Sequence, residues 1–248
     1  MIAQKYRLMR LLYDVNTLYG EIVKKLETIA STKQQVNRKT HETFGLLKER
    51  LSKLKKSLRE DIRKKDPNVE ITYQEMNDYE VHFSFGGDTL MFFMHTNVFS
   101  FPKGHFVHNT DYVKEDPLRG YCGMILVYNF MSDSIKYSRF NDVGTLIGRI
   151  FVNKDGKFFV EGRKQLALLF KEFGENTVSE ENMDIILNTA VMHALDFDLK
   201  APPSEAVQEI TLYQKVQETG QLAIKTGKRV GFEMGFEKND QPSLSRKK

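Results

Sequence analysis

Residues 44–62 read FGLLKERLSKLKKSLREDI, and their apolar side chains recur at intervals of three and four residues. These side chains are Phe44, Leu47, Leu51, Leu54, Leu58 and Ile62. An earlier run shows the same alternation at Leu8, Leu12, Val15, Tyr19, Ile22, Leu26 and Ile29. A repeat of about 3.5 residues keeps one stripe of a helix turned toward a partner helix. The pattern therefore predicts that residues 1–66 are helical and pair as in a coiled coil.

Two arrangements of this helical region fit the sequence. The first proline is Pro67, so one continuous rod is possible. A helical hairpin is the alternative, because Thr32 and Gln35 have the spacing of a capping box, which marks a helix start. The apolar stripe also thins between Ile29 and Phe44, as a turn would require. We favour the hairpin over the rod.

The two apolar stripes also predict self-association. Together they offer more apolar surface than the seam of one hairpin needs. We therefore expect a homodimer through residues 1–65, with Leu12 and Leu51 near its seam. The sequence contains no motif that would identify a further protein partner.

The apolar period changes to two over residues 69–161, which is the period of a half-buried β-strand. Tyr79 to Phe85 alternate in this way, and Gly86-Gly87 has the composition of a tight turn. Further strands are predicted at Leu90–Phe101, Tyr121–Met131, Ile135–Phe140, Leu146–Val152 and Lys157–Val160. Short connections permit antiparallel neighbours and exclude parallel crossovers. We expect an antiparallel meander of five to seven strands.

Helical patterns return over residues 163–219, with one helix start at Ser179 and another after Pro202-Pro203. Residues 229–237 alternate again and predict a closing strand, whereas 238–248 read as a disordered basic tail. The predicted fold is α+β, with an N-terminal helical hairpin, a central antiparallel sheet and C-terminal helices packed on it. The expected division is 1–66 for the helical part and 67–237 for the α+β domain.

Composition limits the functional classes. No apolar run approaches the ~20 residues that cross a bilayer, and the N-terminus lacks the pattern of a secretory signal. Cys122 is the only cysteine, which fits a reducing compartment, so we predict a cytoplasmic protein with no membrane association. Phosphate-loop, dinucleotide-binding and nucleophile-elbow motifs are all missing from the sequence. We therefore lean against an enzyme and expect no cofactor.

Positive charge is concentrated in the second half of the helical region. The chain has a net charge of +4, and residues 33–65 hold twelve basic and four acidic side chains. Basic side chains lie beside the leucine stripe at Lys48, Lys55, Arg59 and Arg63, and such a row could track phosphates. A solvated helix flank explains the same row. Nucleic-acid binding through residues 48–65 is therefore an alternative that we do not favour.

A long polar loop follows Phe101, and loops of this length in a compact domain often serve binding or catalysis. Residues 102–119 gather two histidines three positions apart with several charged side chains. The candidate site residues here are His95, His105, His108, Asp111, Tyr112 and Arg119. A metal held by His95, His105, His108 and Asp111 is an alternative that we do not favour, because the spacing matches no zinc frame.

Taken together, these patterns favour an interaction or ligand-sensing protein that self-associates through its N-terminal helices. The first alternative is a nucleic-acid-associated protein that uses the basic helix 48–65. The second is an enzyme or metal site built on the histidine-rich segment 95–111.

Overall fold

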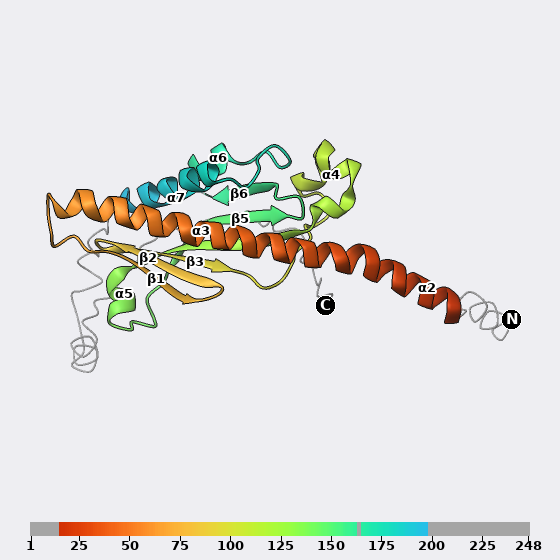
Figure 1. The fold of residues 1–248 in the computed structure, drawn as a ribbon, viewed down its shortest axis with the longest axis horizontal. Coiled ribbons are helices and arrows are strands. Elements are labelled where there is room, and N and C mark those ends of the chain that lie inside the picture. Colours follow the sequence, from red (N-terminus) through yellow and green to blue (C-terminus); the bar gives the residue numbers. More distant parts are fainter. Residues whose placement is uncertain (1–14, 163–164, 198–248) are drawn as a thin grey trace, which may run out of the picture.

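A computed structural model describes residues 15–162 and 165–197. The fold is α+β: a six-stranded antiparallel sheet carries a long N-terminal helix and a C-terminal helix (Figure 1). The main core lies between these two helices and one sheet face. A smaller core on the opposite face lies beneath the loop that follows Phe101. The α+β class and the antiparallel meander predicted from the sequence are confirmed.

The predicted hairpin is wrong. Helix α2 (Val15–Lys25), the π-helical turn η1 (Leu26–Ala30) and α3 (Ser31–Arg63) follow one another without a break. Lys25 and Ser31, on either side of the π turn, both keep right-handed helical dihedral angles. The capping-box spacing at Thr32 starts no helix, because Thr32 is buried inside a continuous one. A single widened turn absorbs the local irregularity instead of a loop.

The two halves of this rod have different surroundings. Three buried apolar side chains of α3 belong to the main core with the sheet: Phe44, Leu47 and Leu51. Helix α2 has no buried residue and extends beyond the sheet (Figure 1). Leu51 is 0% exposed in the main core, so it has no exposed surface to contribute to the predicted dimer seam. The apolar stripe of α3, predicted to pair with another helix, packs on the sheet instead.

The sheet has the strand order β1-β2-β3-β4-β5-β6, and every neighbouring pair is antiparallel. The strands are β1 (Ile71–Asn77), β2 (Glu80–Phe85), β3 (Asp88–Met94), β4 (Cys122–Met131), β5 (Thr145–Asn153) and β6 (Phe158–Gly162). Gly86, at a φ of 57°, and Gly87 form the predicted tight turn between β2 and β3. Because the order is sequential, β1 and β6 are the two edge strands among the six described ones.

One predicted strand does not form. Residues 135–140 were expected to extend the sheet, but α5 (Ser132–Lys136) and an irregular segment occupy this region. Ser134 donates a hydrogen bond to Asp142 across 2.6 Å, and Ser138 has a positive φ of 51°. The backbone amides of Tyr137, Ser138 and Arg139 also donate to carbonyls within residues 133–135, so they are not available to a sheet ladder. The apolar alternation here is therefore not evidence of a strand.

The described C-terminal part contains α6 (Gln165–Leu169) and α7 (Glu180–Leu195). Ser179 caps α7 as predicted, since its hydroxyl accepts a hydrogen bond from the Asn182 amide at 3.2 Å. Arg50 of α3 grips Asp184 of α7 with two nitrogens and so ties the two helices together. The predicted helix after Pro203, the strand at 229–237 and the tail at 238–248 lie outside the described residues.

Within residues 15–162 and 165–197, no helix combines the length and the apolar character that a bilayer crossing demands.

Candidate anion-binding groove

The loop at residues 102–119 forms three short helical turns: η2 (Phe106–Asn109), α4 (Asp111–Glu115) and η3 (Pro117–Gly120). Val107 and Val113 are buried in the smaller core against Phe151 and Phe159 of the sheet. The loop is thus a packed cover over the second sheet face. Its polar side chains therefore belong to a folded element.

Both loop histidines contact groups of the fold. The His105 ring accepts a hydrogen bond from the Val107 amide at 3.4 Å, which caps η2, and it stacks on Phe101 with centroids 4.4 Å apart. The second ring nitrogen of His105 lies 3.4 Å from the Glu161 carboxylate on β6. His108 donates through Nε2 to the Phe101 carbonyl at 3.0 Å. Capping and packing account for both positions.

The alternative metal set does not assemble. His95 Nδ1 accepts a hydrogen bond from the Asn97 amide at 3.0 Å, apart from the loop histidines and their partners. Asp111 is exposed and pairs with Lys114 at 2.9 Å. Among the residues that the structure describes, no three His, Cys, Asp or Glu side chains are grouped to hold a metal ion.

Tyr112 and Arg119 fasten the loop to the turn between β5 and β6. The Tyr112 hydroxyl donates to Asp155 at 2.6 Å and accepts from Asn153 at 2.9 Å. Arg119 stacks on the Tyr112 ring, 4.5 Å from its centroid, and lies 3.3 Å from Asp155. Burial and the Asp155 carboxylate raise the pKa of Tyr112, so it stays protonated and serves as a donor. This contact set is a structural latch.

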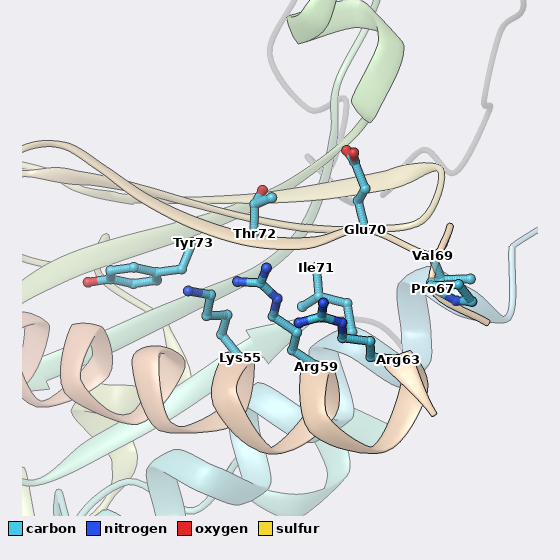
Figure 2. Close-up of a pocket in the computed structure, with 9 residues that line it drawn as sticks. All are labelled: Lys55, Arg59, Arg63, Pro67, Val69, Glu70, Ile71, Thr72 and Tyr73. Carbon is cyan, nitrogen blue, oxygen red and sulfur yellow. The ribbon is translucent and has the colours of Figure 1, made fainter. Parts of the chain in front are cut away.

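A polar concavity lies elsewhere, between the end of α3 and the edge strand β1 (Figure 2). It has a volume of about 530 Å³. We call it the basic groove, and it is lined by Lys55, Arg59, Arg63, Pro67, Val69, Glu70, Ile71, Thr72 and Tyr73. Three of the four side chains predicted from the sequence to bind phosphate therefore line one groove.

The three basic side chains rise from α3 toward β1, from which Ile71 and Tyr73 point back at the helix (Figure 2). Glu70 points away from them, although its residue lines the same groove (Figure 2). Within the described part of the chain, Lys55, Arg59 and Arg63 form no ion pair or side-chain hydrogen bond. Uncompensated positive charge that faces one concavity is a typical feature of an anion site.

Lys48, the fourth predicted side chain, is not in the groove. Its ammonium group donates to Glu75 and to the Asn77 carbonyl, both at 3.1 Å, and it lies 5.2 Å from the centroid of the Phe44 ring. Hydrogen bonds from Tyr73 and from Lys48 hold the pKa of Glu75 below its usual value. Lys48 therefore balances an acid at the far end of β1 and leaves a row of three cations.

Tyr73 is the groove residue that sequence reasoning missed. Sequence spacing does not link it to the basic row, because Tyr73 is separated from Lys55 by a helix end and a turn. Its hydroxyl donates to Glu75 at 2.6 Å, and burial together with that carboxylate raises its pKa. The fixed hydroxyl holds the ring at the groove wall.

Comparisons of this chain with family models, with curated proteins and with solved structures give no significant match.

Proposed function

We propose that the protein is a non-catalytic interaction protein that self-associates through the N-terminal part of its rod. One observation carries this proposal: the stripe of α2 and η1 is exposed on a helix that projects beyond the sheet (Figure 1). The exposed fractions are 77% for Val15, 67% for Tyr19, 55% for Ile22 and 59% for Leu26. Apolar side chains aligned on one helix face are typical of a helix that is buried in an assembly.

A second copy of the chain is the occupant that best fits this stripe. The spacings of 4, 3 and 4 residues suit a coiled-coil seam, and a stripe of this kind is complementary to itself across a two-fold axis. Burial of each such side chain contributes about 1.5–3 kcal/mol, so four per helix supply a substantial driving force. Leu8 and Leu12 continue the repeat and lie outside the described residues.

The alternatives receive unequal support. Nucleic-acid binding is supported by the three cations of the basic groove and weakened by the ion pair that engages Lys48. The loop alternative is weakened because His105, His108, Tyr112 and Arg119 all serve local packing. A cytoplasmic location stays part of the proposal, on the ground that Cys122 is the single cysteine.

Light scattering over a range of concentrations tests the proposal. The wild-type chain should give a mass near twice 28.8 kDa, and Ile22→Glu should give the monomer mass. Lys24→Glu is the matched control, because Lys24 lies on the opposite side of the same helix and should leave the dimer intact. Circular dichroism should show that all three proteins are folded. A wild-type mass near 28.8 kDa at every concentration would contradict the proposal.

A further inference from the structure

The edge of β1 beside the basic groove has backbone groups that pair with none of the described strands. The Gly86 amide donates to the Glu70 carbonyl at 3.1 Å, which fixes the hydrogen-bonded pairs of the β1–β2 ladder. In an antiparallel ladder, alternate residues point their N–H and C=O groups toward the neighbour and away from it. Thr72 and Gln74 therefore bond to β2. Ile71, Tyr73 and Glu75 direct their backbone groups outward, where no described strand pairs with them.

The cation row runs alongside this open edge. Lys55, Arg59 and Arg63 are four residues apart on α3, a rise of about 6 Å from one to the next. Side chains on one face of an extended strand are about 6.6 Å apart, because each residue rises about 3.3 Å. The two spacings nearly match over three positions. A strand added to β1 would thus place every second side chain opposite a cation.

From this match we propose that the basic groove is a docking site for an extended acidic segment of a partner protein. The segment adds to the edge of β1 as a seventh strand and carries acidic side chains at every second residue. Backbone hydrogen bonds to Ile71, Tyr73 and Glu75 supply the affinity of an added strand. The cations supply specificity, because they favour acidic side chains in the segment. This site is at the other end of the rod from the exposed stripe, so it does not depend on self-association.

The same observations favour a peptide over a nucleic acid. The row of free cations is only about 12 Å long. Nucleic-acid interfaces bury about 1,000 Å² or more of protein surface, which is a larger area than so short a row can provide. Lys48 cannot lengthen the row while it pairs with Glu75. Tyr73 is the one aromatic residue that lines the groove, and single strands are bound by several stacking side chains. The carbonyls of an open strand edge repel a phosphate, whereas an added peptide strand uses both the N–H and the C=O groups.

The direct test is peptide binding to the full-length chain at an ionic strength of about 0.15 M. The probe is an acetylated and amidated heptapeptide, TEVEVET, and its neutral counterpart TQVQVQT is the ligand control. We expect saturable binding of the acidic peptide and at least tenfold weaker binding of the neutral one. Amide hydrogen exchange should slow at Ile71, Tyr73 and Glu75 when the acidic peptide is bound, since those N–H groups gain partners.

Two variants separate the groove from general charge. The triple variant Lys55→Glu/Arg59→Glu/Arg63→Glu should bind the acidic peptide at least tenfold more weakly. A control variant, Lys24→Glu/Arg38→Glu/Lys64→Glu, carries the same charge change at exposed positions outside the groove and should bind as the wild type does. Thermal unfolding confirms that each variant is folded.

Backbone methylation of the peptide separates strand addition from electrostatic attraction. One peptide is N-methylated at its glutamates and another at its valines. Only one of the two should lose binding, because alternate amides face β1 and the solvent. Equal binding by both peptides, or no saturable binding of TEVEVET, would overturn the proposal. So would a short single-stranded RNA that binds more tightly than TEVEVET and displaces it, because the groove would then recognise phosphates.

Discussion

Residues 15–29 and 31–63 belong to one continuous helix, yet their apolar stripes are used differently. The second stripe is buried in the main core, where Leu47 and Leu51 are 0% exposed. The first extends past the sheet, and Leu26 is 59% exposed. The repeat is nearly the same in both halves, so the repeat alone does not reveal what covers it. A stripe of leucines shows only that something packs there.

The largest expected effect contrasts the two stripes directly. Leu51→Ala should lower the free energy of unfolding by about 3 kcal/mol, because it leaves a cavity between α3 and the sheet. Leu26→Ala is the matched truncation and should change it by less than about 0.5 kcal/mol in a monomeric background such as Ile22→Glu. Urea unfolding followed by circular dichroism measures both. Similar losses in the two variants would mean that the projecting half is also packed within the monomer.

The next largest expected effect concerns the close approach of α3 to strand β4. A Cβ at Gly123 of β4 would lie 2.0 Å from the Thr40 hydroxyl oxygen and 2.8 Å from the Thr40 Cβ. Gly123→Ala should therefore destabilise the protein by about 1–3 kcal/mol, since the helix must move. Gly45→Ala is the counterpart on the outer side of α3, where a Cβ would have no atom within 4 Å.

Gly45→Ala should stabilise the protein by about 0.5–1 kcal/mol, because alanine is the better helix former. The two glycine substitutions should thus have opposite signs in the same thermal-unfolding assay. Stabilisation by Gly123→Ala would contradict the close approach of α3 to β4.

The smallest expected effect compares the two loop histidines, His105 and His108, which have different surroundings. His105→Ala should cost about 1 kcal/mol, because it removes the cap of η2 and the stacking on Phe101. His108→Ala removes one hydrogen bond at an exposed position and should cost no more than about 0.5 kcal/mol. Chemical unfolding at pH 7.5 gives both values. If neither substitution changes stability, the loop histidines are free for another role, as the sequence suggested.

Much of the fold was predictable because periodicity reports burial. The period of two located five of the six strands, and Ser179 correctly marked the start of α7. The errors occurred where local patterns have more than one solution. Thr32 and Gln35 fit a capping box, but such a pair also fits inside a helix, where the threonine is buried. The alternation at 135–140 failed for the same reason, because local backbone hydrogen bonds fold the segment on itself.

The candidate site was predictable only in part. Helical spacing placed Lys55, Arg59 and Arg63 on one face, and they do line one groove. Spacing could not show that Lys48 is neutralised, because its partner Glu75 is a strand away. Helical spacing also could not predict the β1 wall of the basic groove, since Ile71 and Tyr73 meet the helix only after the chain reverses at Pro67.

Residue order alone predicted an amphipathic helical region, an antiparallel meander and a basic row on one helix face. Those features follow from residue order, because the helical and strand repeats act over a few neighbours. Which stripe became core and which stayed exposed depends on tertiary contacts, and so does the set of cations whose charge stays uncompensated. Those outcomes depend on contacts between residues far apart in the chain, and a local repeat holds no information about such partners.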